Sequence, residues 1–341
     1  MKNEFSRRRF GQILLGASAV LACSGVFGAV AGTGKKIAIL PKTLINDVFQ
    51  IKIVEAAERT AITLGIPTER FSSSNDVAVQ DQINIIEALI ARGEFGAIVL
   101  APTVARGLGN VVRKAKRAGI FVILVDASTD GDGHVTVIQG DNIKAAGAAA
   151  DFSATLISEK GKVAMLEGEP GGTTAAQRTQ GFHEALKKYP DIQLVSSITG
   201  RWTLPGGVQA TEAIITAHPD IDLIFAASDM MALGARQVLE RQAKKAQVKG
   251  NGDQAKKFSE VKTVGFDGVA EAVKQIWAGK MSGTVSQDPA FMGSKAVEIA
   301  GQLMSGEKQP SDFPPLIDSN MLLVTADNVD EYAAEIGLQK S

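Results

Sequence analysis

The stretch K-T-V-G-F-D-G at residues 262–268 predicts a short β-strand that ends in a turn before a helix. Gly265 and Gly268 loosen the backbone around this turn, and Asp267 lies between them. In open α/β sheets a ligand binds beyond the carboxyl ends of the strands, so a carboxylate in this turn faces the ligand crevice. An acidic residue at this place also caps a following helix for purely local reasons. The stretch alone leaves ligand binding and helix capping open.

Units of the same kind, an apolar strand followed by an amphipathic helix, recur on both sides of this stretch. The predicted strands lie at residues 37–40, 70–74, 97–101, 120–125, 135–138, 162–166, 194–198, 223–226, 261–265, 283–285 and 320–325. The predicted helices lie at residues 48–65, 80–90, 103–118, 142–158, 176–188, 207–218, 230–244, 269–278 and 292–304. Because strands and helices alternate in two successive sets, we predict an α/β protein with two doubly wound, Rossmann-like lobes built on parallel sheets.

Length and composition agree with a folded protein of two domains. The 341 residues suffice for two cores of ordinary size. Hydrophobic residues make up 45% of the chain and charged residues 21%, which excludes a disordered chain. The formal net charge is −1, so nothing indicates a nucleic-acid partner.

Residues 1–31 are predicted to be an export signal rather than part of the folded body. Arginines at positions 7–9 precede an apolar run at residues 13–30. The segment S-R-R-R-F at residues 6–10 matches the twin-arginine export pattern. We expect cleavage after Ala31 and a periplasmic mature protein.

Membrane attachment of the mature chain is the less favoured alternative. The segment V-L-A-C at residues 20–23 is a poor lipobox because Leu21 is bulky, so a lipid on Cys23 is a minority prediction. A retained membrane anchor is disfavoured further, because the apolar run falls short of the ~20 residues that a span needs. Cys23 is the only cysteine, so we expect no disulfide.

Motifs of enzymatic chemistry are missing from the sequence. The three histidines, at positions 134, 183 and 218, have no metal-ligand spacing. The chain has neither a nucleophile elbow nor a phosphate-binding P-loop, and G-E-P-G-G-T at residues 168–173 lacks the full dinucleotide fingerprint. We therefore predict a protein that is not an enzyme and that holds no cofactor or metal.

Polar and aromatic side chains collect instead at the carboxyl ends of the predicted strands. Each of them alone is as readily a helix cap or a surface residue, but their shared position would place them around one crevice. The residues found in this way are Asn46, Asp47, Phe49, Asp126, Arg178, Trp202, Ser228, Asp229, Asp267 and Gln287, and all of them except Asp47 and Asp229 are taken as candidate ligand contacts.

The chemistry of these side chains suits a neutral, polyhydroxylated ligand. Carboxylates accept hydrogen bonds from hydroxyls, a guanidinium donates them, and amides do both. Phe49 and Trp202 offer faces for the C–H surface of a sugar-like ring. Paired carboxylates also occur in glycosidases. Here the acids lie one per turn beside amide and guanidinium groups, which favours recognition over acid–base catalysis.

Several motifs along the chain, taken together, resemble the periplasmic sugar-binding proteins of ABC importers. The resemblance is to the ribose-binding branch, which has the periplasmic binding protein type 1 fold shared with the lactose-repressor family, and it covers essentially the whole mature chain. The motifs that carry it are T-L-I-N-D-V-F at 43–49, V-D-A at 125–127, G-D-N at 140–142, T-T-A-A-Q-R-T-Q-G-F at 173–182, T-A-H-P-D at 216–220, S-D-M-M-A-L-G-A at 228–235, V-G-F-D-G at 264–268 and S-Q-D-P at 286–289.

The resemblance implies a molecule that closes on its ligand. Two lobes would be joined by three crossovers, near Gly140, Gln287 and Ile317, and would close as a hinge. The N-terminal lobe would comprise residues 33–140 plus 288–317, and the C-terminal lobe residues 141–287 plus 318–341. A membrane permease would recognise the closed form, and we expect a monomer. A partner of a chemoreceptor or sensor kinase with the same fold is the alternative, and a glycosidase is less favoured.

The resemblance also gives roles to individual residues. Asn46 and Phe49 look like the ligand contacts after the first strand, and Trp202 falls where the family has an aromatic wall. The positions that hydrogen-bond the sugar are matched by Asp126, Arg178, Asp267 and Gln287.

Departures from the family pattern leave the ligand open. Ala127 stands where ribose binders carry an arginine, Val48 replaces a stacking phenylalanine, and Ser228 replaces an asparagine. Lys42 adds a cation at the rim of the first strand. Another pentose, a hexose or a linear polyol is therefore as consistent with these residues as ribose is.

Overall fold

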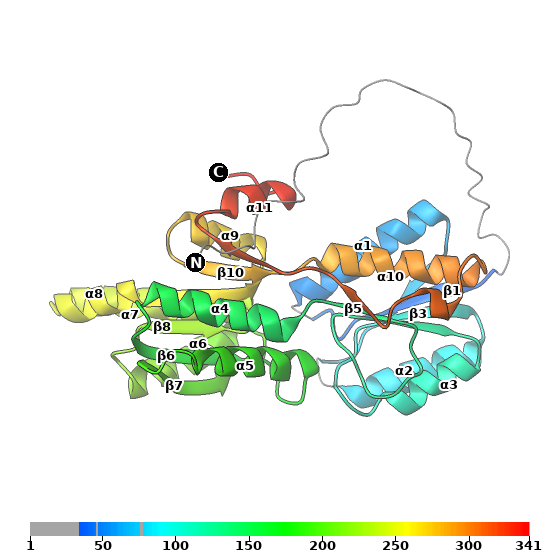
Figure 1. Cartoon of the computed structure of the whole chain (residues 1–341), viewed down its shortest axis with the longest axis horizontal. Coiled ribbons are helices and arrows are strands. Elements are labelled where there is room, and N and C mark those ends of the chain that lie inside the picture. Colours follow the sequence, from blue (N-terminus) through cyan, green and yellow to red (C-terminus); the bar gives the residue numbers. More distant parts are fainter. Residues whose placement is uncertain (1–33, 46, 76–77, 341) are drawn as a thin grey trace, which may run out of the picture.

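The computed structural model describes residues 34–45, 47–75 and 78–340, which form two α/β lobes joined end to end (Figure 1). Each lobe is built on a six-stranded sheet. In spatial order the first sheet consists of β11 (Leu316–Asp318), β5 (Val137–Gln139), β4 (Phe121–Val125), β3 (Phe95–Leu100), β1 (Lys36–Leu40) and β2 (Thr68–Arg70). The second consists of β12 (Leu322–Thr325), β10 (Gly283–Ser286), β9 (Lys262–Asp267), β8 (Leu223–Ala226), β6 (Gly161–Glu167) and β7 (Ile192–Thr199).

Strand direction matches the prediction of parallel sheets. Every neighbouring pair in the first sheet is parallel, and in the second sheet β12 runs antiparallel to β10 while the other pairs are parallel. The predicted class, an α/β protein with two doubly wound lobes, is confirmed. The predicted export signal at residues 1–31 lies outside the described residues.

Helices cover both faces of the first sheet. Helices α1 (Val48–Leu64) and α10 (Pro289–Met304) pack together on one face, and α2 (Val79–Arg92) and α3 (Gly109–Arg117) pack together on the other. Strand β1 explains why its sequence is a continuous apolar run. Ile37 and Ile39 enter the core beneath α1 and α10, whereas Ala38 and Leu40 enter the core beneath α2 and α3. A strand buried on both faces has no polar side.

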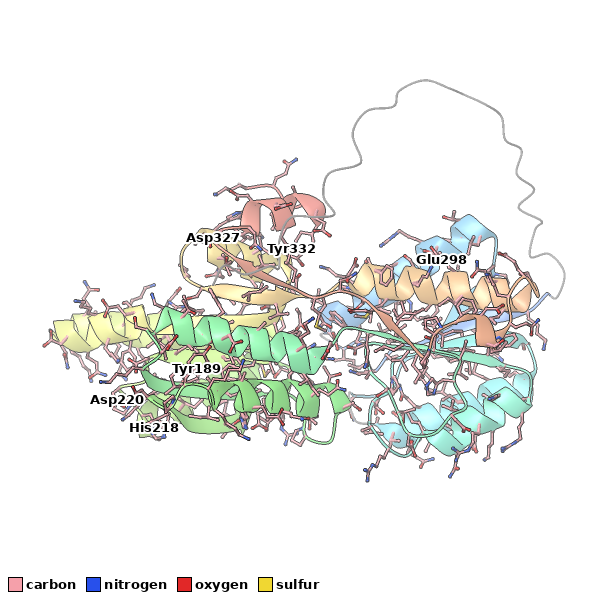
Figure 2. The ribbon with its side chains drawn as sticks, in the orientation of Figure 1. Tyr189, His218, Asp220, Glu298, Asp327 and Tyr332 are labelled. Carbon is pink, nitrogen blue, oxygen red and sulfur yellow. The ribbon has the colours of Figure 1, made fainter. Side chains whose placement is uncertain are left out.

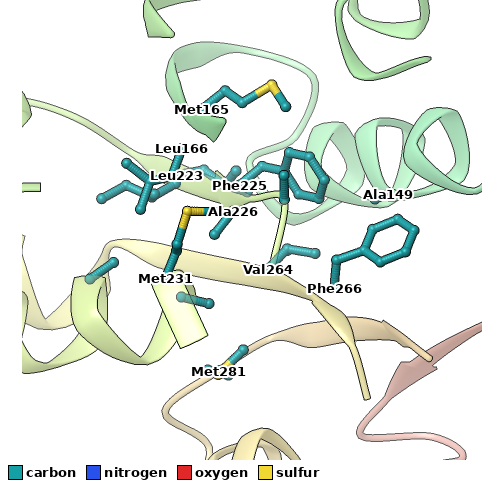
Figure 3. Close-up of a cluster of buried hydrophobic side chains, with 14 of the residues drawn as sticks. Ala149, Met165, Leu166, Leu223, Phe225, Ala226, Met231, Val264, Phe266 and Met281 are labelled. Atoms are coloured by element: carbon teal, nitrogen blue, oxygen red, sulfur yellow. The ribbon is translucent and has the colours of Figure 1, made fainter. Parts of the chain in front are cut away.

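The second lobe has a single larger core. Its helices are α4 (Asn142–Leu156), α5 (Thr173–Leu186), α6 (Leu204–Ala217), α7 (Asp229–Val248), α8 (Gly252–Glu260), α9 (Ala270–Trp277) and α11 (Val329–Glu335). Phe182 of α5 stacks on Phe225 of β8 with ring centroids 4.2 Å apart. Figure 3 shows Phe225 beside Phe266 of β9 in this core. A 3₁₀ turn at Pro310–Asp312 follows α10.

The chain crosses between the lobes three times. The crossings lie between β5 and α4, between β10 and α10, and between β11 and β12. Two of them run side by side, because Ser319 N donates to Gln139 O at 3.2 Å. Met321 packs so closely on Gly140 that a Cβ at residue 140 would overlap it. These short segments are the only covalent links between the lobes among the described residues.

Some predicted boundaries were wrong. The strand predicted at 70–74 is β2, three residues that end at Arg70. The helix predicted at 103–118 begins only at Gly109, because Asp130 Oδ1 accepts hydrogen bonds from the Gly107 and Gly109 amides, each 3.0 Å long, and fixes the preceding residues as a loop. The prediction did not include α8, β11 or α11.

Candidate functional site

A cavity of about 80 Å³, room for several water molecules, lies between the lobes at the carboxyl ends of both sheets. In the first lobe its walls come from the loop after β1, the start of α1 and the residue after β4. In the second lobe they come from α5 and from the turns after β7, β8, β9 and β10. The lining residues are Lys42, Ile45, Asp47, Val48, Phe49, Gln50, Asp126, Thr174, Arg178, Trp202, Thr203, Ser228, Met230, Asp267, Val269 and Gln287.

The structure brings the candidate residues from the sequence together. Asn46 lies outside the described residues. The other candidates all border the cavity: Lys42, Phe49, Asp126, Arg178, Trp202, Ser228, Asp267 and Gln287. Their common position is observed, and their role in binding a ligand remains a prediction.

Asp126 is the buried carboxylate of the first lobe. It directly follows β4 and is 4% exposed. Lys42 Nζ lies 2.5 Å from Asp126 Oδ2, and Gln50 Nε2 donates to the same oxygen at 2.8 Å. Gln50 is itself oriented, because its Oε1 accepts a 3.2 Å hydrogen bond from the Lys42 amide. Both contacts to Asp126, from Lys42 and from Gln50, fall on Oδ2, so within the described residues Oδ1 is left for a ligand.

Asp267 is the corresponding carboxylate of the second lobe. Its Oδ1 accepts hydrogen bonds from Arg178 Nη1 at 3.1 Å and from Gln287 Nε2 at 2.7 Å. Arg178 is fixed by two further bonds, from Nε to Asn142 Oδ1 at 2.9 Å and from Nη1 to Ala227 O at 2.6 Å. As with Asp126, the contacts that this carboxylate makes with the described residues use one oxygen, and Oδ2 is left for a ligand.

Burial shifts the ionisation of the Arg178–Asp267 pair in opposite directions. Loss of solvent raises the pKa of Asp267, and Arg178 and Gln287 act against that rise. Loss of solvent likewise lowers the pKa of the Arg178 guanidinium, and Asp267 opposes the change. The guanidinium remains charged at neutral pH because its usual value is so high.

Both carboxylates sit on unusual backbone. Asp126 has φ 65° and Asp267 has φ 116°, in the region that favours glycine. Such strain costs of order 1–3 kcal/mol and persists where the surroundings hold the residue in place. The two acids therefore share burial, a cation partner and a strained conformation at the end of a buried strand. Strained residues of this kind cluster at functional sites.

Aromatic rings form part of the wall. Trp202, at φ 63°, lies against Gly168 so closely that a Cβ at residue 168 would overlap the ring. The Arg178 guanidinium carbon lies 5.6 Å from the centroid of this ring and 3.7 Å from that of Phe266. Phe49 borders the cavity from the first lobe. The Arg178 guanidinium thus makes cation–π contacts with the rings of Trp202 and Phe266.

The alternative reading of Asp267 as a helix cap was wrong. The cap of α9 is Val269, whose own side chain makes no capping bond. The Val269 amide instead donates to Asp229 Oδ2 at 2.9 Å. Ser228, in contrast, both borders the cavity and caps α7, because its Oγ accepts from the Met231 amide.

The prediction missed several neutral residues of the site. Gln50 orients Asp126, Asn142 orients Arg178, and Thr174 lines the cavity with a buried Oγ1 that has no hydrogen-bond partner among the described residues. A neutral polar residue inside a helix has no pattern that marks it. The only signal for Gln50 was its place in the first turn of α1, the helix that follows β1.

The described residues contain no group of three or more His, Cys, Asp or Glu side chains arranged to hold a metal ion. None of the described helices is both long and apolar enough to span a bilayer.

Two parallel α/β lobes with a polar cavity between them, linked by three crossings, define a two-lobe ligand-binding protein. The chain belongs to the periplasmic binding protein family, because the model of the periplasmic binding protein domain matches residues 37–308.

Individual relatives are similar over most of their length. A ribose import binding protein of Salmonella typhimurium is 30% identical over 294 residues, which cover 86% of this chain and 93% of the relative. The D-allose-binding periplasmic protein of Escherichia coli is 30% identical over 300 residues, covering 84% and 91%. A solved solute-binding protein from Actinobacillus succinogenes with bound D-allose aligns with a TM-score of 0.76 and 28% identity, covering 87% of this chain and 100% of that one.

Proposed function

We propose that this protein is a periplasmic solute-binding protein that captures a neutral monosaccharide or sugar alcohol between its lobes and delivers it to an ABC importer. Its family and the import and binding roles named for its relatives support the proposal. The observation that carries it is the pair of buried carboxylates, Asp126 and Asp267, each with one oxygen held by protein cations and amides.

The charge balance of the cavity favours a neutral ligand. Lys42 pairs with Asp126, and Arg178 pairs with Asp267, so a ligand need not supply a charge. Hydroxyl groups donate well to the second oxygen of each carboxylate, and such charge-assisted bonds contribute roughly 1.5–3 kcal/mol each. Because one acid lies on each lobe, a ligand that bonds both stabilises the closed arrangement.

The identity of the sugar depends on the first-lobe wall. Ala127 is buried outside the cavity lining, and the cation that meets Asp126 comes from Lys42. The resemblance to ribose binders implies an arginine at the position of Ala127 instead. We therefore include other pentoses, hexoses and linear polyols with ribose as candidate ligands.

The wider working model follows the same proposal. Residues 33–140 plus 288–317 and residues 141–287 plus 318–341 move as two lobes about the three crossings. A membrane permease receives the ligand from the closed form, and the protein acts as a monomer. Export by the twin-arginine route releases it into the periplasm, with a lipid on Cys23 as the minor alternative.

A thermal-shift panel of pentoses, hexoses and polyols tests the proposal. A ligand at 100 times its dissociation constant stabilises the folded protein by about 2.7 kcal/mol, so a true ligand raises the melting temperature in a concentration-dependent way. We expect a strong response to a small subset of sugars. No response across the panel would count against the sugar class.

A turnover assay separates binding from catalysis. The protein is incubated with the sugar that stabilises it most, and the mixture is followed by chromatography. We expect the sugar to be recovered unchanged. Any product that forms in proportion to protein concentration contradicts a binding role.

A further inference from the structure

Two buried side chains that do not border the cavity hold the turn that carries Asp267. Tyr332, on α11, is 6% exposed, and its hydroxyl donates to Gly268 O at 2.8 Å. Helix α11 is formed near the carboxyl end of the chain and lies against α9 (Figure 1). The last helix of the protein thus contacts the residue directly after Asp267.

The other side of the turn is held by Asp229, the first residue of α7. Asp229 is fully buried, and its Oδ2 accepts a 2.9 Å hydrogen bond from the Val269 amide. Its Oδ1 accepts from Thr284 Oγ1 at 2.7 Å, and the same Thr284 oxygen accepts from the Gly268 amide at 3.4 Å. The amides of residues 268 and 269 and the carbonyl of residue 268 therefore all have fixed partners.

The turn also has no room to shift. Gly268 has φ 72°, and a Cβ there would overlap Tyr332 Oη and lie 2.7 Å from Ser286 Cβ. The backbone is enclosed between α11 and β10, and Asp267 directly before it is strained at φ 116°. A strained residue keeps its conformation only where neighbouring groups enforce it. The partners of Gly268 and Val269 are the groups that can do so.

We infer that Tyr332 and Asp229 are positioning residues for ligand binding, which set the direction of the Asp267 carboxylate without touching the ligand. The inference rests on the proposed function, since it assigns these residues to the same cavity. Its consequence is that affinity depends on one hydroxyl group, that of Tyr332, which the C-terminal helix carries to the turn.

The chain offers matched controls for this idea. It contains two tyrosines, and Tyr189 also donates its hydroxyl to an oxygen, Asp151 Oδ1, at 3.0 Å. Figure 2 shows Tyr189 on the side of the second lobe away from α11 and Tyr332. A second anchor of α11 is the 2.6 Å bond from Trp277 Nε1 to Asp330 Oδ1, which does not involve the turn. Tyr189→Phe thus controls for loss of a hydroxyl, and Asp330→Ala for looser docking of α11.

Calorimetric titration with the best sugar of the thermal-shift panel gives the binding readout. We expect Tyr332→Phe to weaken binding at least tenfold, while Tyr189→Phe and Asp330→Ala bind like the wild type. In an Asp267→Asn background, adding Tyr332→Phe should weaken binding less than twofold further, because the hydroxyl acts through Asp267. Wild-type affinity in Tyr332→Phe, or a full tenfold loss in the Asp267→Asn background, overturns the inference.

Hydrogen exchange of the turn gives a readout that needs no ligand. We expect the amides of residues 268 and 269 to exchange at least tenfold faster in Tyr332→Phe than in the wild type or in Tyr189→Phe. Unchanged exchange overturns the positioning role. If exchange rises but no sugar binds the wild type, the positioning of the turn stands and the proposed function fails.

Discussion

The chemistry of the cavity depends on single residues, because protein hydrogen bonds hold several of its buried polar side chains in a fixed orientation. Arg178 illustrates this, with Nε and Nη1 committed to Asn142, Ala227 and Asp267. A guanidinium is planar and presents its donors in a fixed fork, whereas a lysine ammonium is a point charge. The shape of Arg178, and not only its charge, is therefore expected to matter.

Substituting Arg178→Lys tests this point. The change keeps the charge but loses the fork, so we expect ligand affinity to fall at least tenfold and the free energy of unfolding to fall by roughly 1–3 kcal/mol. Arg241→Lys is the control, because Arg241 pairs with Glu212 with both side chains 51% exposed, and such pairs contribute little. Titration calorimetry and urea unfolding measure both quantities. Equal ligand affinity in Arg178→Lys and Arg241→Lys would contradict a role for Arg178 in binding.

Asp229 gives a dependence of stability on pH. Burial, and then the neighbouring Asp267, raises the pKa of Asp229 well above its usual value. A raised carboxyl pKa favours the folded state below about pH 4, and this contribution is lost as pH rises through the folded-state value. Asparagine does not ionise. The melting temperature of Asp229→Asn, relative to that of the wild type, should therefore increase as pH rises from 4 to 8. A difference in melting temperature that stays constant from pH 4 to 8 would contradict this assignment.

Pairs of elements position the site residues, and the packing of α4 against α5 is one example. Arg178 lies on α5, and its partner Asn142 begins α4. Gly181 lets the helices approach, because a Cβ there would overlap the Ile143 carbonyl. At Gly147, on the facing side of α4, a Cβ would make ordinary contacts of 3.7 Å.

The two glycines form a matched pair for mutation. We expect Gly181→Ala to lower the free energy of unfolding by roughly 1–3 kcal/mol and to weaken ligand binding, because α5 and Arg178 shift away from Asn142. Gly147→Ala should be neutral or stabilising by up to about 1 kcal/mol, since alanine favours a helix. Denaturant unfolding and calorimetry report the two effects. A destabilised Gly147→Ala with an unaffected Gly181→Ala would show that this contact is assigned wrongly.

The elements that could be predicted from sequence are the ones with a strong local pattern. Buried parallel strands such as β4 are continuous apolar runs, and their helices repeat apolar residues at helical spacing. In contrast, β11 is a three-residue edge strand with exposed ends, and α11 has only seven residues. Short elements of this kind form because they pack against the rest of the fold, and no local sequence pattern predicts them.

The same limit applies to the candidate site. Charged and aromatic residues after strands, such as Asp126 and Trp202, could be found because topology places strand ends together. The orienting bond from Gln50 to Asp126 joins residues 76 positions apart, and the bond from Tyr332 to Gly268 joins residues 64 apart. Contacts of that range depend on the completed fold, so they could not be inferred from local sequence patterns.

Over the residues that the structure describes, the molecule consists of two lobes with separate cores and the cavity between them. The core of the second lobe shares no residue with the cores of the first, and the three crossings connect the lobes. Domain closure around a ligand is the expected motion of such an arrangement. The ligand favours the closed form only by as much as it binds that form better than the open one.

Small-angle scattering measures this closure directly. We expect the radius of gyration to decrease when the best sugar is added to the wild type, because its hydroxyls join Asp126 of one lobe to Asp267 of the other. A sugar that gives no thermal shift serves as the control and should leave the scattering curve unchanged. A bound sugar that changes nothing in the wild-type curve would contradict the hinge proposal.

The central claim is that one acid from each lobe holds the same neutral ligand. Calorimetric titration of the best sugar into the wild type, Asp126→Asn and Asp267→Asn tests it most directly, because asparagine keeps the size of aspartate and tolerates positive φ better than most residues. We expect one site per chain in the wild type and at least tenfold weaker binding in each variant. Wild-type affinity in either variant, or no binding heat with any sugar of the panel, would contradict the claim.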